Sequence, residues 1–192
     1  MDILLCLLKT KQMTTQMIRS KWAIDPAHSE VRFKIKHLGI TNVNGTFAVF
    51  QGDVETENDD FDNASVHFEI NADSISTKHA DRDKHLKSPD LFDTQTFPRI
   101  TFDGKLQKGG DDYQLSGMLT IRGTTKHIVM DAEFTGTEKG RFNDFRAGFE
   151  VNGKINCKDF GLTWNVLTEA GSFVVGEEVK LQFDIQLIRQ PD

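Results

Sequence analysis

Several residue types and patterns that mark particular classes of protein are scarce or missing. The 192 residues contain two cysteines, Cys6 and Cys157, so no disulfide framework is predicted. Acidic residues outnumber basic ones by 29 to 23, and the net charge of −6 argues against nucleic acid or an anionic membrane surface as the partner. No run approaches the roughly 20 apolar residues of a membrane span, which argues against stable membrane insertion.

Sequence signatures of catalysis are missing as well. The chain has no Walker loop, no dinucleotide fingerprint after a strand, no G-x-S-x-G elbow and no H-E-x-x-H motif. Lys154 and Lys158 could lower the pKa of the Cys157 thiol, but no histidine lies near it in sequence. Because no residue pattern specifies a reaction, we predict a protein that is not an enzyme and that has no cofactor.

The first 20 residues do not resemble the rest. Their apolar run, Ile3 to Leu8, is shorter than the about 7–15 residues typical of a secretory signal, and Asp2 stands where a basic residue is expected. We therefore predict that residues 1–20 are a disordered extension, with Met17 as an alternative start, and that the protein is cytoplasmic. Export to the periplasm is the alternative.

Phenylalanine, by contrast, is abundant. There are 15 Phe against one Tyr and two Trp, which suits a large, dry interior. From Trp22 onward apolar and polar residues alternate with the period of a half-buried strand, most clearly in residues 28–37, 64–70, 115–121, 128–134, 145–151 and 179–187. About eight such strands joined by short turns predict one all-β antiparallel domain over residues 21–190, either a sandwich or a closed barrel. The strand lengths favour the barrel.

One segment, residues 78–97, breaks the alternation. Residues 81–88 are compatible with a helix that ends before Pro89. Its i,i+4 pairs, His79 with Asp83 and Asp81 with His85, could share a metal ion, but the two pairs face different sides of a helix. A solvated polar helix is the stronger interpretation.

Eight short strings in order resemble the YceI family, the lipocalin-like polyisoprenoid-binding proteins. They span residues 22 to about 188 and read W-x-x-D-x-x-H-S (from Trp22), F-K-I-K-H (from Phe33), G-T-F (from Gly45), R-D-x-H-L-x-S-x-D-x-F (from Arg82), F-P-x-I-T-F (from Phe97), G-x-L-T-I-R-G-x-T-K (from Gly117), D-F-G-L-x-W (from Asp159) and V-G-E-E-V-K (from Val175). One departure is Cys157-Lys158, where the family commonly has a basic pair.

The resemblance implies an extended eight-stranded antiparallel lipocalin-like barrel with a short helix near one end. It also implies a bacterial, stress-related carrier, often a homodimer, whose apolar pore holds a long-chain amphiphile such as a polyisoprenoid, an isoprenoid quinone or a fatty-acyl amide. Strand parity then selects the residues expected to line this pore: Phe33, Ile35, Phe47, Val49, Phe68, Phe102, Leu119, Phe149, Trp164 and Phe183. His37, Thr163 and Asn165 are the candidates for its polar end.

Two other functions stay open at this point. A closed-core structural or interaction module would show the same alternation, because periodicity does not distinguish a filled barrel from a hollow one. A metal-dependent enzyme that uses His79 and His85 is the third and weaker alternative.

Overall fold

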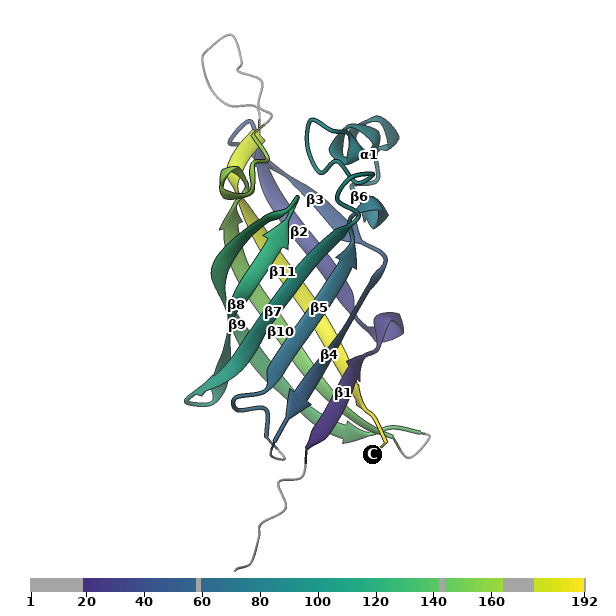
Figure 1. The fold of residues 1–192 in the computed structure, drawn as a ribbon, viewed down its shortest axis with the longest axis vertical. Coiled ribbons are helices and arrows are strands. Elements are labelled where there is room, and N and C mark those ends of the chain that lie inside the picture. The colour runs from purple at the N-terminus through teal and green to yellow at the C-terminus, as the bar shows by residue number, and fades with distance from the viewer. Residues whose placement is uncertain (1–18, 58–59, 142–143, 164–174, 192) are drawn as a thin grey trace, which may run out of the picture.

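The computed structural model describes residues 19–57, 60–141, 144–163 and 175–191, which form one antiparallel sheet with a single α-helix (Figure 1). The strands are β1 (Ser20–Ile24), β2 (Glu30–His37), β3 (Thr41–Phe47), β4 (Phe50–Thr56), β5 (Ser65–Asn71), β6 (Ile75–Ser76), β7 (Arg99–Gly109), β8 (Asp112–Ile121), β9 (Thr124–Lys139), β10 (Phe145–Asn156) and β11 (Val175–Arg189). The helices are α1 (Ala80–Lys87) and the 3₁₀ turns η1 (Pro26–His28), η2 (Ala72–Ser74) and η3 (Cys157–Phe160).

Eight of these strands close into a barrel. They follow the order β1-β4-β5-β7-β8-β9-β10-β11, and β11 pairs with β1 to complete the ring. The predicted all-β, eight-stranded antiparallel barrel with one short helix near an end is therefore confirmed. Most of the predicted N-terminal extension lies outside the described residues.

The wall continues beyond the closed ring at one end. The last residues of β11 pair with β1, whereas Val175–Asp184 of the same strand pair with β2. Strands β3 and β6 extend this wall from β2, and α1 lies beside them (Figure 1). The two ends of the barrel thus differ: one is a closed ring, and the other is bordered by the continuation of the same sheet through β2, β3 and β6 and by a helix.

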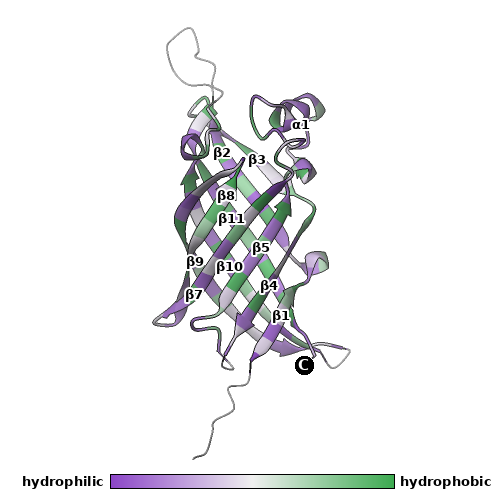
Figure 2. Cartoon of the chain, viewed as in Figure 1, coloured by the Kyte–Doolittle hydropathy of each residue, from purple (hydrophilic) through white to green (hydrophobic). Residues whose placement is uncertain are grey.

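Hydropathy alternates along the strands, as the colours in Figure 2 show. The apolar side chains of this pattern are buried inside the barrel. Where a large ring lies flat over its own strand and the next one, glycine makes the space. Gly104 and Gly117 face each other on β7 and β8, and a Cβ on either would lie within 2.7 Å of the Phe102 ring. The glycine at the start of the G-x-L-T-I-R-G string therefore serves packing.

The helix begins and ends within one residue of its predicted position. The His79 side chain accepts the Arg82 amide at the N-terminus, and Asp83 accepts the Thr77 amide at 2.8 Å. These contacts use both members of the His79–Asp83 pair, one to cap the helix and the other to anchor it. Among the described residues no group of three or more His, Cys, Asp or Glu side chains is placed to hold a metal ion, and none of their helices is long and apolar enough to span a membrane.

Candidate functional site

The barrel interior holds an elongated apolar space in two sections. The larger, about 500 Å³, lies at the α1 end, and a smaller one of about 90 Å³ lies deeper in the ring. The sections share five lining residues, so they are consecutive parts of one interior: Ile70, Ile100, Leu119, Leu181 and Phe183. A volume of this size falls in the range of small-molecule binding sites.

The structure places ten of the thirteen predicted site residues around this space. Phe33, Ile35, His37, Phe47 and Thr163 line the larger section, Phe68, Phe102 and Phe149 line the deeper one, and Leu119 and Phe183 line both. Trp164 and Asn165 lie outside the described residues. Eight of the ten residues chosen by strand parity thus line the cavity, together with His37 and Thr163, two of the candidates for its polar end.

The placement of Val49 in the pore wall is wrong. Val49 is 56% exposed and lines neither section of the cavity. The strand β3 ends at Phe47, and a bend at Ala48 resets the parity before β4 begins at Phe50, whose side chain is buried instead. A hydrogen bond from the Asn71 amide to the Val49 carbonyl fixes this bend.

Aromatic rings close the deep end of the cavity. Phe61 packs edge-on against Phe149 at 5.0 Å between ring centroids and lies 5.2 Å from Trp22. Phe134 and Tyr113 contact Phe149 at 5.2 and 5.9 Å. These rings pack in tilted and edge-to-face contacts. Phe61, Phe149, Trp22 and Tyr113 are all buried, so the interior is blind at this end. The alternation did not identify Phe61, because it lies in a polar turn between β4 and β5.

The other end, the mouth, carries the polar groups of the site. Arg82 is held in place by Thr77, whose hydroxyl accepts Nε at 2.7 Å and whose carbonyl accepts Nη2 at 2.9 Å. Lys158 of η3 and Glu177 of the neighbouring β11 form an ion pair at 2.5 Å in the lining of the mouth. The polar lining residues that the sequence did not predict are Arg32, Thr77, Asp81, Arg82, His85, Lys158 and Glu177.

Asp83 anchors this arrangement from behind. Partial burial raises the pKa of Asp83, but hydrogen bonds from the Thr77 hydroxyl, the Thr77 amide and the Ser76 hydroxyl outweigh burial and hold the pKa below its ordinary value. The carboxylate is therefore ionised near neutral pH and fixes Thr77, which in turn orients Arg82.

Arg122 clamps the mouth from the β8–β9 turn. Its guanidinium donates to the carbonyl of Pro89, at 2.7 Å, and to that of Gly161, at 3.4 Å, and so joins the α1 segment to η3. Arg122 and Gly123 both have positive φ angles, 49° and 72°, as a two-residue hairpin turn requires. Arginine is uncommon in this conformation. We infer that the two hydrogen bonds of the Arg122 guanidinium compensate for the strained backbone.

Cys157 lies in the cavity wall at the mouth. Burial raises the pKa of its thiol, and the negative charge of Glu177 adds to this, in spite of the opposing effect of Lys158. Lys158 thus has the lowering effect on this pKa that the sequence allowed for, but burial outweighs it. The side chain is a neutral thiol that contributes to the lining.

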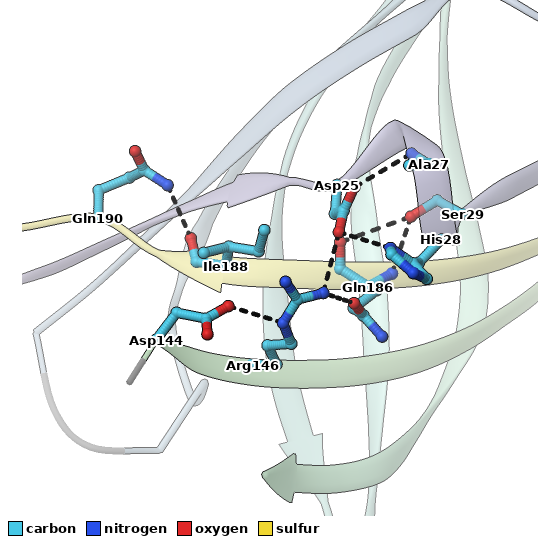
Figure 3. A network of polar contacts seen from close by, with 9 residues as sticks. All are labelled: Asp25, Ala27, His28, Ser29, Asp144, Arg146, Gln186, Ile188 and Gln190. Carbon is cyan, nitrogen blue, oxygen red and sulfur yellow. Dashed lines mark hydrogen bonds and ion pairs between the residues drawn. The ribbon is translucent and has the colours of Figure 1, made fainter. Parts of the chain in front are cut away.

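A polar network explains the W-x-x-D-x-x-H-S string, for which the sequence offered no mechanism (Figure 3). Asp25 accepts from His28 Nδ1 at 2.8 Å and from Arg146 Nη1 at 3.0 Å, and the Gln186 amide donates to the Ser29 hydroxyl at 2.9 Å. Arg146 also contacts the Gln186 side chain. Because none of these residues lines the cavity, the network is structural: it fixes the kink at η1 where β1 passes into β2 along β11.

Charges in this network stabilise one another. Partial burial raises the pKa of Asp25. Hydrogen bonds from His28, the Ala27 amide and Arg146 together lower it by more, so the pKa lies below its ordinary value. The hydrogen bond to Asp144, at 2.7 Å, and the contact with Asp25 raise the pKa of Arg146. Both groups are therefore charged at neutral pH.

Comparison with known proteins places this architecture in a family. The family model of the YceI-like domain matches residues 22–187. A UPF0312 protein of Pectobacterium atrosepticum is 35% identical over 164 residues, which cover 85% of this chain and 82% of the relative. A UPF0312 protein of Yersinia pestis is also 35% identical, over 83% of this chain and 80% of its own length.

Solved structures share the fold. The YCEI protein of Campylobacter jejuni is 32% identical, with a TM-score of 0.67 over 82% of this chain and 91% of that one. A polyisoprenoid binding domain from Saccharophagus degradans has a TM-score of 0.65 over 88% and 98% of the two chains, at 18% identity. At that identity the likeness shows the fold alone.

Proposed function

The chain belongs to the YceI-like family, and from this premise we propose that it binds and sequesters or carries a long-chain amphiphile. The blind, apolar cavity with a polar mouth is the observation that carries the proposal. The solved domain from Saccharophagus degradans, described as polyisoprenoid binding, adds support for an isoprenoid guest. Isoprenoid quinones and fatty-acyl amides have the same general shape and polarity.

The cavity sets the orientation of the guest. The tail enters toward Phe61 and Phe149, where every lining residue of the deeper section except Thr101 is apolar, and the head stays beside Thr77 and Arg82 at the mouth. A tail of about 15 carbons gains roughly 12 kcal/mol at about 0.8 kcal/mol per buried CH₂. Association costs of about 4–15 kcal/mol leave room for affinities from weak to tight, so the fit of the tail decides the outcome.

The proposed role is binding without chemistry. Asp83 and His79 hold the helix in place, and the Cys157 thiol is neutral, so none of these three side chains at the mouth is an activated nucleophile. A closed-core module is disfavoured by a specific observation: the interior has about 500 Å³ of space at the mouth that side chains do not fill.

Solvent extraction of the purified full-length chain, followed by mass spectrometry, tests the proposal. We expect one class of hydrophobe to be recovered in stoichiometric amount, and the emptied protein to rebind an isoprenoid quinone or oleamide. If nothing is recovered and neither probe binds, the carrier function is wrong. Recovery of a chemically altered probe after incubation would instead indicate an enzyme.

A further inference from the structure

The β2–β3 hairpin at the mouth carries exposed apolar side chains. Leu38 and Ile40 occupy the three-residue turn between His37 and Thr41, and they are 44% and 79% exposed. Ile40 is the most exposed large hydrophobic residue in the part of the chain that the structure describes. His37 and Val43, just below the turn, line the cavity, so the turn stands at its entrance.

The backbone of this turn points to a function other than stability. Leu38 has a φ of 52°, in the left-handed region where glycine and asparagine are favoured and a bulky side chain is an outlier. A residue that is both strained and exposed contributes little to folding. Such outliers persist where the side chain serves a function.

Basic residues lie directly below the same turn on the outer wall. Lys34 on β2 is paired in register with Lys180 on β11, which is paired in turn with Lys154 on β10, and Lys36 lies between this row and the turn. Lys154 has an ion-pair partner, Glu178. Lys34, Lys36 and Lys180 form no ion pair with any other described residue. Like charges opposed across strands destabilise a sheet, so an anionic partner would relieve this row.

We propose that this hairpin docks the mouth of the barrel onto a bilayer that contains anionic lipids. Leu38 and Ile40 insert into the interface, and the lysines contact the headgroups. The net charge of −6 argued against such a surface, but the segment 31–47 contains no acidic residue and is itself basic. The two acidic residues opposite it on β11 are already paired, Glu177 with Lys158 and Glu178 with Lys154. The inference rests on the proposed function, since a carrier of a membrane lipid has to reach its guest in the bilayer.

Distances along the strand rank the lysines. At about 3.3 Å per residue, Lys36 lies about 7 Å and Lys34 about 13 Å from Leu38. Because the screening length is about 8–10 Å at physiological salt, Lys36 contributes more than Lys34. The α1 side of the mouth mixes Asp81, Lys84 and Asp90, so we expect docking on the hairpin corner rather than flat across the mouth.

Vesicle flotation of the full chain tests the proposal. The vesicles contain phosphatidylcholine alone or an equimolar mixture with phosphatidylglycerol, and no isoprenoid. We expect wild type to float with the mixed vesicles only. Leu38→Asn/Ile40→Thr should weaken binding at least about tenfold, and Lys34→Gln/Lys36→Gln about 5- to 30-fold, at about fivefold per lysine.

The matched control is Met118→Ser/Val129→Thr. These residues are each 45% exposed on β8 and β9, which β10 and β11 separate from the hairpin in the sheet, and their replacement should leave binding unchanged. All variants keep the apolar segment of residues 3–8, so a difference between them reports on the hairpin. Leu38→Asn should also raise the Tm, since asparagine suits the left-handed turn, which separates lost docking from lost folding.

Three results would overturn the docking proposal. The first is that wild type fails to float with the mixed vesicles. The second is that the hairpin and control variants float equally well. The third is that wild type is a dimer, the hairpin variants are monomers, and neither form binds vesicles. Binding of an isoprenoid quinone in solution is measured in parallel. Docking that fails while the quinone binds overturns only the docking, whereas docking that persists without quinone binding overturns only the carrier function.

Discussion

The two ends of the barrel are built from the same alternating strands but solve opposite problems. At the closed end, Trp22, Phe61 and Phe149 fill the ring and exclude water. At the mouth, β2 and β3 replace β1 and β4 in the wall, and the interior opens into a space of about 500 Å³. In this barrel, aromatic packing at the closed end contributes to stability, and the mouth is left open to receive a guest.

The largest effect is expected where the two ends meet. Phe183 lines both sections of the cavity, and Phe183→Asp would place a carboxylate in an apolar interior. We expect loss of quinone binding by at least about 100-fold, or failure to fold, measured by quinone titration and circular dichroism. Gln182→Asp, on the outer face of the same strand, is the control and should bind normally. Equal effects of both changes would show that the faces are inverted.

The ends should also differ in what an aromatic ring contributes. Phe61 is 2% exposed and touches three other rings, so Phe61→Ala should lower the free energy of unfolding by about 3–5 kcal/mol. Phe92 at the mouth is half-buried, with one ring contact to Phe47 at 6.2 Å, and Phe92→Ala should cost about 1 kcal/mol.

Urea unfolding measures both changes, with quinone affinity as the second readout. Phe92→Ala should weaken quinone binding although it hardly changes stability, and Phe61→Ala should do the reverse. Similar losses of stability for the two variants would contradict the division between a stabilising end and a receiving end.

Sequence reasoning reached the strands, the barrel and most of the wall because each depends on local alternation. It failed where a short irregularity decides the outcome. A bend at Ala48 turned Val49 outward, and a polar turn concealed Phe61. The space inside the barrel had no sequence signal, since hollow and filled barrels share one periodicity. Likewise, the Arg146 contact with Asp25 joins residues 121 positions apart, a distance over which no local pattern acts.

Acid should weaken the polar network of Asp25 and Arg146 that fixes the kink at η1. The folded-state pKa of Asp25 is depressed below its ordinary value near 3.8, so its contribution is present above that value and is lost as the pH falls through the folded pKa. Asp25→Asn should cost about 2 kcal/mol at pH 7, because Arg146 loses a charged partner.

The difference between wild type and Asp25→Asn should shrink between about pH 5 and pH 2. Urea unfolding across this range measures it, and Asp83→Asn is the comparison at the mouth, where the same sign applies. A difference that grows on acidification would mean that the pKa of Asp25 is raised in the folded protein.

Gly45→Ala should change stability the least of these variants, but it should narrow the cavity. Gly45 on β3 lies opposite Phe33, and a Cβ at position 45 would lie 2.2 Å from Cζ of that ring. The ring is the mobile end of a side chain, so in Gly45→Ala it should swing into the mouth at a cost of about 1 kcal/mol. Quinone affinity should fall because the displaced ring occupies the tail's path, and Gly45→Ala/Phe33→Leu should restore it. If the double variant binds no better than the single one, then Gly45 sets the strand geometry rather than the width of the entrance.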